Sequence, residues 1–561
     1  MSKKLASLLA ILMAFSLIAA ACGDDDGDDA TDTDQTDDGT DDGTDDGTDD
    51  GTDDGTDDGT DDATCVGEVR YGIVEPSWID SFNTQDSEGF EVARLLFDGL
   101  TDYGEDLSPV PAVATDWSSN DDKTEWTFNL RDDVTFHDGT AVTAQSFIDA
   151  FNRVANPDNV SDVSYHGSYV AKVTGWDTVE AGEATEISGL SAPDDTTLVI
   201  SLDAPNPIIP KIVAHPVFSP LNSAAVDAGG AGYSDAPVGN GPYVMDGSWQ
   251  HDVSINLAQN ENYYGTAGKP CGVAFKIYDS IDTMYLEAQA GNVDISDVPP
   301  EKIPSASDDF DGRYIDVEVG SFTYLGFPND KPGFDNVDIR RALSLAIDRP
   351  TIMEVIFDNT RAPATGFVPP LAPGAIGECA NATFDPELAK ELFDGAGGIE
   401  GNAVTIYFNS GGGHEEWTEA VANGWLQILG IDATFVAQEF SPYLDQLQSD
   451  EGVDGPFRLG WGWDAPSASN FLGPLYGSES GDNFSGYASD AFDAAMTEFN
   501  NATTEEDGFP ALATAQEVLC EDVPVAPIYF GRGQRVYTDN VSDVVYSVFG
   551  FTLLEQVTVA G

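Results

Sequence analysis

Basic residues are scarce in this sequence: 22 Lys and Arg stand against 100 Asp and Glu in 561 residues, for a formal net charge of -78. This imbalance argues against nucleic acid as a partner, because a phosphate backbone is held mainly by Lys and Arg. Only five His occur, and the chain lacks the Gly-x-Ser-x-Gly, His-Glu-x-x-His and Walker motifs of common hydrolases and nucleotide-binding enzymes. The sequence therefore gives no support to a catalytic centre.

Long apolar runs are absent except near the N-terminus. Lys3 and Lys4 precede an uncharged, mostly apolar run that ends in small residues before Cys22, which predicts a signal peptide over residues 1–22. The segment Leu17–Gly23 resembles a bacterial lipobox. This implies that Cys22 carries a lipid that anchors the protein to the outer face of the cell membrane. Ala19 stands where that pattern prefers Leu, so an ordinary cleaved signal with an incidental Cys is the alternative.

Residues 23–64 lack any apolar side chain larger than Ala and contain 21 Asp among 42 residues, with no base. Such a segment cannot form a core, and its like charges repel, so we expect a disordered tether with a reach of roughly 35 to 40 Å. Diffuse association with cations fits it better than a fixed calcium site, since no Glu is present to close a binding loop. Leaving out these 21 acids and the two N-terminal Lys gives -59 for the remaining chain. That acidity reflects either habitat or ligand preference.

Cysteine is also rare, with five residues. With Cys22 assigned to the lipid, four remain, and an even number in an exported protein predicts two disulfides. Cys65 and Cys271 each begin a strand-like run and are candidate neighbours in one sheet, so we expect Cys65 to pair with Cys271 and Cys379 with Cys520. A zinc site is not favoured, because no Cys-x-x-Cys pair occurs. We expect no bound metal.

Short β-branched runs at 196–202 and 404–408 alternate with helix-like stretches at 337–347 and 415–429. This alternation predicts an α/β fold.

Seven motifs then follow in order along the chain: Trp126–Phe147, Pro237–Tyr243, Asn260–Tyr264, Phe334–Arg349, Gly460–Pro466, Asn483–Tyr487 and Asp522–Tyr529. Together they resemble the family 5 extracellular solute-binding proteins, the peptide- and nickel-binding receptors of ABC importers. The resemblance covers residues 66–545. No single motif would suffice, but seven in the same order are hard to obtain by chance.

The resemblance implies an α/β, two-lobed type II periplasmic binding protein fold with an inserted subdomain in the first lobe. We expect the first lobe at 66–319 and 529–561, its subdomain near 105–235, and the second lobe at 320–528. Closure of the lobes would capture a small solute, with an oligopeptide or dipeptide as the leading ligand. An ABC permease with cytoplasmic ATPases would receive it. The protein would act as a monomer without a cofactor.

The resemblance also implies ligand-binding residues. Asp464 matches the acid that accepts the α-amino group in peptide-binding members, and Trp461 and Trp463 are candidate apolar walls. Further candidates, at the expected lobe crossover and in a later loop, are Phe322, Thr323, Tyr324 and Asn483, with Phe484 and Tyr487 weaker.

Each candidate has a plain alternative. The two Trp suit one face of a buried strand, and Asp464 suits a turn before Ala-Pro. The family's usual Asp-Tyr-Pro-Asp-Pro continuation is replaced here by Asp-Ala-Pro-Ser-Ala, which leaves peptide specificity open. The glycines at 411–413 before His414 suit either a ligand-adjacent loop or a surface turn.

Several motif residues are expected to be structural. Asp138-Gly139 predicts a tight turn, and Thr143 predicts a helix cap. The Gly residues of the Pro237–Tyr243 motif predict a turn with unusual backbone angles. Arg340 and Arg341 are expected to pair with acids around their helix.

Two other functions compete with solute capture for import. One is a secreted hydrolase acting on peptides or glycans, and the other is a surface receptor without transport. With 100 acids in the chain, a carboxylate pair can always be proposed for glycoside hydrolysis, so such a pair carries little weight without geometry.

Overall fold

A computed structural model describes residues 65–84, 86–159, 173–410, 412–449 and 451–560. The predicted signal peptide over 1–22, the predicted lipid attachment at Cys22 and the predicted tether over 23–64 lie outside the described residues, as does Gly411.

One large mixed sheet organises the described chain. It contains eleven strands in the order β15-β14-β16-β12-β17-β11-β1-β10-β9-β8, with β13 paired to β17. From one edge to the other, with β13 last, these are Asp432–Gln438, Ala403–Asn409, Phe457–Gly462, Tyr314–Gly326, Val525–Tyr537, Ile295–Asp297, Glu68–Ile73, Gly272–Ile277, Ser254–Gln259, Tyr243–Met245 and Ala362–Pro363.

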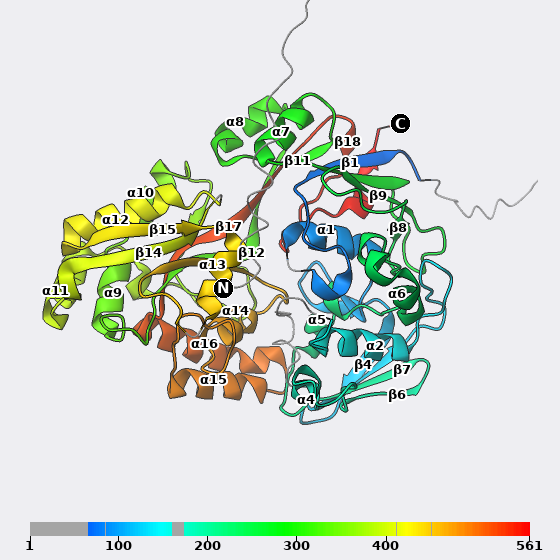
Figure 1. The fold of residues 1–561 in the computed structure, drawn as a ribbon, viewed down its shortest axis with the longest axis horizontal. Helices are drawn as coiled ribbons and strands as arrows, with labels where there is room; N and C mark the ends of the chain where they lie inside the picture. The colour runs from blue at the N-terminus through cyan, green and yellow to red at the C-terminus, as the bar shows by residue number, and fades with distance from the viewer. Residues whose placement is uncertain (1–64, 85, 160–172, 411, 450, 561) are drawn as a thin grey trace, which may run out of the picture. The chain divides into compact units, whose positions relative to one another are not determined.

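Strands β12 and β17 are the longest, with 13 residues each, and they lie antiparallel to each other. The strands beyond β12 and those beyond β17 come from different parts of the chain. Figure 1 shows yellow elements on one side of this pair and blue to green elements on the other. A register shift between Glu318 and Phe322 divides β12, and Ser321–Gly326 pairs with β16. The C-terminal half of β12 therefore lies beside the Trp-rich strand β16.

Smaller sheets complete the described strands. A four-stranded antiparallel sheet runs in the order β4-β5-β7-β6, and two-stranded sheets pair β2 with β3 and β18 with β19. Their bounds, for β2 to β7 and then β18 and β19, are Thr101–Tyr103, Pro109–Pro111, Ala114–Ser119, Glu125–Leu130, Leu190–Asp194, Thr197–Ser201, Val541–Ser542 and Thr558–Val559. The four-stranded sheet lies inside the segment expected to form the subdomain.

The helices pack against these sheets and around their edges (Figure 1). In the first part of the chain they are α1 Ser87–Leu96, α2 Ala144–Ala155, α4 Trp176–Glu180, α5 Ile209–Ile212, α6 Ser223–Gly229, α7 Ile281–Gln289 and α8 Ile303–Asp309. In the second part they are α9 Val337–Leu345, α10 Arg349–Val355, α11 Pro386–Ala396, α12 Glu415–Leu429, α13 Phe440–Gln448, α14 Ser469–Tyr476, α15 Asp490–Asn500 and α16 Glu505–Asp522.

The cysteine pairing agrees with the sequence prediction. Cys65 is joined to Cys271, and Cys379 to Cys520. The first pair lies just before β1 and β10, which are parallel neighbours with Glu68 opposite Gly272. The structure thus joins two strand starts that are 206 residues apart in sequence.

The structure confirms the predicted turn at Gly139 and the predicted helix cap at Thr143. It corrects the reason given for the glycines of the Pro237–Tyr243 motif. Gly139 has a φ of 84° after Asp138, and Thr143 is the N-cap of α2. Gly239 and Gly241, in contrast, do not have positive φ. A Cβ on Gly239 would lie 1.9 Å from the carbonyl oxygen of Leu96 at the end of α1. The glycine is required by close approach to that helix, rather than by an unusual backbone angle.

The two arginines of α9 behave differently. Arg341 pairs with Glu521 at 2.8 Å and approaches Asp338 at 3.7 Å, as expected. The prediction of an acid partner is wrong for Arg340, which donates hydrogen bonds to the carbonyl oxygens of Phe334, Asp522 and Val523. A buried guanidinium reaches those carbonyls because it presents five donors in a fixed fork.

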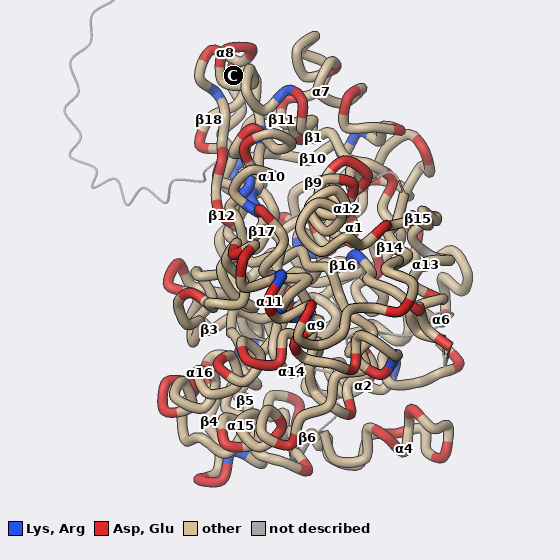
Figure 2. The backbone as a smooth tube through the Cα atoms, turned by 90° about the vertical axis from the view of Figure 1, so that its left-hand side faces the viewer, with Lys and Arg blue, Asp and Glu red and all other residues tan. Residues whose placement is uncertain are grey.

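Asp and Glu residues occur at many positions along the described chain, whereas Lys and Arg occur at few (Figure 2). Among the described residues, no helix combines the length and apolar character that a membrane crossing requires.

Candidate ligand-binding site

The predicted crossover residues and the Trp-rich strand meet in one register. Phe322 lies opposite Trp461, and Thr323 lies opposite Gly460. Phe322 and Tyr324 point to the same face of β12, and their rings stack with centroids 5.4 Å apart. Phe322, Thr323 and Tyr324 are all buried. Burial raises the pKa of Tyr324, with the nearby Tyr443 and Asp482 adding to the effect.

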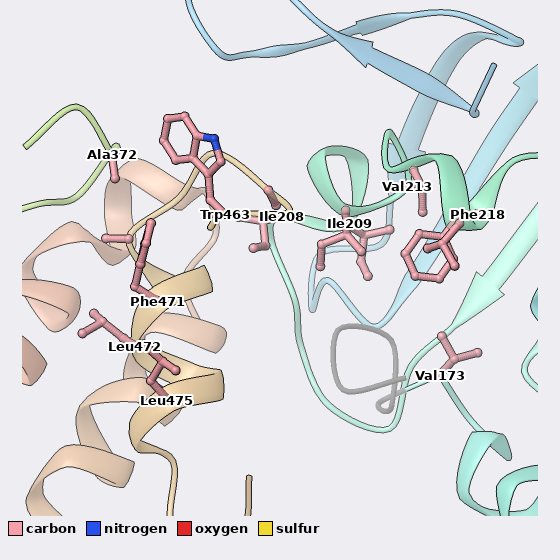
Figure 3. Close-up of a cluster of buried hydrophobic side chains, with 14 of the residues drawn as sticks. Val173, Ile208, Ile209, Val213, Phe218, Ala372, Trp463, Phe471, Leu472 and Leu475 are labelled. Atoms are coloured by element: carbon pink, nitrogen blue, oxygen red, sulfur yellow. The ribbon is translucent and has the colours of Figure 1, made fainter. Parts of the chain in front are cut away.

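Trp463 connects different parts of the chain. Its backbone N–H donates to the carbonyl oxygen of Gly320, and a Cβ on Gly320 would lie 2.0 Å from the indole. The indole packs on Phe549 at 5.3 Å and on Phe471 at 6.5 Å. The apolar cluster that contains Trp463 also includes Ile208, from the 66–319 segment (Figure 3). Trp463 is therefore buried where the two predicted lobes pack together.

Trp461 is half-buried on β16. The indole nitrogens of Trp461 and Trp463 are both buried, and neither has a hydrogen-bond partner among the described residues. A buried donor without a partner is uncommon in folded proteins and calls for an explanation. A bound ligand is one group that would supply an acceptor.

Asp464 follows Trp463, and its side chain is 25% exposed. Its backbone N–H donates to the Asn470 side chain at 2.9 Å, which fixes the turn. Residues from the other predicted lobe contact this turn. The hydroxyl of Tyr103 lies 3.0 Å from the Asp464 carbonyl oxygen, and Nε2 of His215 lies 3.8 Å from its carboxylate. The carboxylate is therefore held near the first lobe without being fully removed from water.

Asp482 is a site residue that the sequence analysis missed. It is 7% exposed. Burial and the nearby Asp464 raise its pKa to about 7. Its carboxylate makes no ion pair among the described residues. Two acids close together favour a positively charged ligand group, because each carboxylate disfavours the ionisation of the other until a cation lies between them.

Arg458 is the second missed residue. Its Nη1 donates to Asn409 at 2.9 Å, while its Nε is buried without a partner. Within the described residues no carboxylate lies within ion-pair distance of this guanidinium. Burial lowers the pKa of Arg458, opposed by the neighbouring hydroxyls of Tyr529 and Tyr443.

Glycines lie between Arg458, which belongs to β16, and Asp464, which follows the end of that strand. Because side chains alternate along a strand, Arg458, Gly460 and Gly462 share a face. A Cβ on Gly460 would lie 3.2 Å from the Arg458 guanidinium, and one on Gly462 would have no heavy atom within 4 Å. A bare strip of backbone thus runs between a cation and an anion. Alternating glycines between a base and an acid were the sequence signal that could have identified it.

The remaining candidates lie around this strip. The Asn483 side chain donates to the carbonyl oxygens of Gly477 and Tyr487 and accepts from Ser485. Its amide closes its own loop, next to Asp482. His414 is buried, and burial followed by the charge of Arg458 lowers its pKa to about 3. A ligand role for either residue stays a prediction.

Comparison with known proteins identifies the fold and the family. The model of the bacterial extracellular solute-binding proteins, family 5, matches residues 108–483. The periplasmic murein peptide-binding protein MppA of Escherichia coli is 29% identical, over 85% of this chain and 92% of that protein. The E. coli oligopeptide-binding protein OppA is also 29% identical, over 79% and 83% of the two chains.

Among solved structures, the complex of Haemophilus influenzae OppA with the peptide RPPGFSPFR superposes with a TM-score of 0.75 at 25% identity. It covers 89% of this chain and 100% of that one. The predicted α/β, two-lobed periplasmic binding protein fold is confirmed by this likeness. The chain belongs to the bacterial extracellular solute-binding proteins of family 5.

Proposed function

We propose that this chain is the substrate-binding lipoprotein of an ABC importer, and that it captures short peptides with free amino and carboxyl termini. The first lobe, 66–319 with 529–561, and the second lobe, 320–528, close on the peptide. The permease receives it unchanged. A lipid on Cys22 and the 23–64 segment hold the monomeric receptor at the outer face of the cell membrane.

The observation that carries this proposal is a pair of opposite charges, one at each end of the backbone strip that contains Gly460 and Gly462. This strip is called the glycine strip below. Asp464 accepts the peptide ammonium, with Asp482 adding negative charge nearby. Arg458 donates hydrogen bonds to the terminal carboxylate. A zwitterionic peptide matches both charges, whereas an anionic or uncharged solute leaves at least one of them unpaired in a partly dry site.

The strip also indicates a ligand length. The Arg458 guanidinium reaches to Gly460, and Gly460 and Asp464 are four residue steps apart, which is at most about 13 Å at the rise of a strand. An extended chain of three to four residues spans about the same distance. We therefore infer tripeptides or tetrapeptides as the preferred ligands, with Trp461 and Trp463 as the apolar surroundings of their side chains.

One tripeptide in four forms tests this assignment: unblocked, N-acetylated, C-amidated and blocked at both ends. Asp464→Asn should weaken binding of the unblocked form by about 10- to 100-fold, the value of one charged hydrogen bond, and barely change binding of the acetylated form. Arg458→Met should weaken the free acid by a similar factor and spare the amide. Isothermal titration calorimetry gives the affinities.

Two matched variants act as controls. Asp445→Asn and Arg131→Met each remove a charge away from the strip and should leave all four affinities unchanged. If Asp464→Asn weakens the acetylated and unblocked peptides equally, Asp464 does not bind the amine. If Arg458→Met weakens the amide and the acid equally, the terminal carboxylate is held elsewhere.

We further propose that the chain binds without turnover. Membership in a solute-binding family supports this over a secreted hydrolase, and the resemblance to importer receptors supports it over a receptor without transport.

A further inference from the structure

Three side chains of the predicted first lobe reach across to the turn that carries Asp464. Lys211 of α5 donates from Nζ to the carbonyl oxygen of Pro466 at 3.0 Å, across 255 residues of sequence. The Tyr103 hydroxyl lies 2.7 Å from the Lys211 carbonyl oxygen and 3.0 Å from that of Asp464. His215 approaches the Asp464 carboxylate at 3.8 Å. The amine-binding turn is therefore held from the opposite lobe.

Lys211 also forms an ion pair with an acid of the predicted second lobe. Its Nζ lies 2.6 Å from Oε2 of Glu505, the first residue of α16, and each side chain is only 9% exposed. The other carboxylate oxygen of Glu505, Oε1, is buried and has no hydrogen-bond partner among the described residues. Because one oxygen of the Glu505 carboxylate has no hydrogen-bond partner, stabilisation of this buried carboxylate in the closed arrangement depends on the ion pair with Lys211.

We propose that Lys211 and Glu505 form a latch between the lobes, which holds the Asp464–Pro466 turn in position and sets ligand affinity by favouring the closed form. Lys211 is a positioning residue in this proposal and does not contact the ligand. The effect on peptide affinity rests on the proposed function, whereas the effect on the turn itself does not.

The physical chemistry of a buried pair makes such a latch reversible. When the lobes part, both charges regain water, so the open form is not strongly penalised. When the lobes close, desolvation is offset by the ion pair and by the bond to Pro466. Removing one partner leaves an uncompensated charge in the closed form only, which shifts the equilibrium toward the open form.

A double-mutant cycle tests the latch with Lys211→Met, Glu505→Leu and the combination. Each single change should weaken binding of the unblocked tripeptide at least tenfold. The combination leaves no uncompensated charge, so it should bind more tightly than either single variant but more weakly than the wild type, because the ion pair and the bond to Pro466 are both lost. Lys390→Met, which removes an exposed ion pair with Asp394 on α11, should change nothing.

Hydrogen–deuterium exchange of the ligand-free full-length protein provides a second readout. The amides of residues 463–470 should exchange faster in each single variant, and the combination should fall between the single variants and the wild type. This result does not need a peptide, so it holds even if the ligand assignment fails. Unchanged exchange and affinity in the single variants, or a combination as impaired as both singles together, would overturn the latch.

Tyr103→Phe covers the case in which a single variant does not fold. It removes only a hydroxyl at the same turn and should weaken peptide binding severalfold, with faster exchange at 463–470. If Tyr103→Phe matches the wild type in both measurements, the turn is not held from the first lobe and the proposal fails.

Discussion

At the scale of single residues, the candidate site is marked by buried charged side chains that have no partner of opposite charge among the described residues. Several buried charged groups have a partner of opposite charge, such as Asp294 with Arg70 and Asp80 with Arg153. Arg458 and Asp482 have no ion pair among the described residues, although both are largely buried. Burying an unpaired charge costs free energy of desolvation. In a receptor, such a charge is a natural position for a ligand group of opposite charge.

The sequence indicated part of this arrangement. Asp464, Trp461 and Trp463 were predicted from the motif that contains them, and the structure pairs Trp461 with Phe322 across neighbouring strands. Lys211 and Tyr103 carried no local signal, because their partners lie more than 250 residues away. The spatial neighbours of a turn depend on tertiary packing, which no local pattern in the sequence records.

Asp482 provides a prediction for pH dependence. Its pKa is raised from below 4 to about 7, so the folded state binds this proton more tightly than the unfolded state does. The group therefore lowers stability as pH rises from about 4 to 7, and the full penalty is present above pH 7. Asp482→Asn should stabilise the ligand-free protein at pH 8 by on the order of 2 to 4 kcal/mol.

At pH 4 the same variant should match the wild type, because Asp482 is then protonated in the folded state. Urea unfolding at the two pH values measures the difference, with Asp445→Asn as the exposed control that should be neutral at both. A stabilisation that is equal at pH 4 and pH 8 would show that Asp482 is ionised throughout, contrary to this prediction.

At the scale of elements, local patterns located helices and strands better than they explained individual contacts. Helix α12 has the bounds expected for it, 415–429, because two Glu begin its first turn and Gly430 ends it with a φ of 75°. Helix α9 ends at Leu345, two residues before the expected 347. The register shift in β12 was not predictable, since it depends on two partner strands that are distant in sequence.

Gly139 and Gly239 require glycine for different physical reasons: positive φ at Gly139 and close approach to α1 at Gly239. Gly139→Ala places a side chain at positive φ in open space, so it should cost about 1 to 2 kcal/mol of stability. Gly239→Ala drives a methyl group into the Leu96 carbonyl and should cost 3 kcal/mol or more. Chemical denaturation of both variants measures the difference. Equal losses would mean that α1 moves away readily and that the close approach is not required.

The disulfides should contribute through the unfolded chain. The Cys379–Cys520 bond closes a loop with a sequence separation of 141 residues, and removing such a link typically costs about 2 to 5 kcal/mol. Replacing both Cys by Ala should lower the midpoint of thermal unfolding by several degrees. Adding a reductant to the wild type, which also opens Cys65–Cys271, should lower the midpoint at least as far. A variant that melts with the oxidised wild type would show that the link restricts the unfolded chain very little.

At the scale of the whole molecule, one apolar cluster contains residues from both predicted lobes, including Phe218 and Trp463. The proposed latch and the turn that carries Asp464 lie beside it. In the proposed mechanism, closure buries apolar surface and also completes the polar contacts around Asp464. A ligand that bridges Asp464 and Arg458 on the second lobe would gain these first-lobe contacts only when the lobes close, which would couple binding to conformation.

The most direct test of capture without turnover is native mass spectrometry of the protein after prolonged incubation with an unblocked tripeptide. We expect a single added mass equal to one intact tripeptide per chain, released unchanged on denaturation. Recovery of the protein without added mass, together with shorter peptides or amino acids in solution, would contradict the proposal that this receptor binds a peptide and passes it on intact.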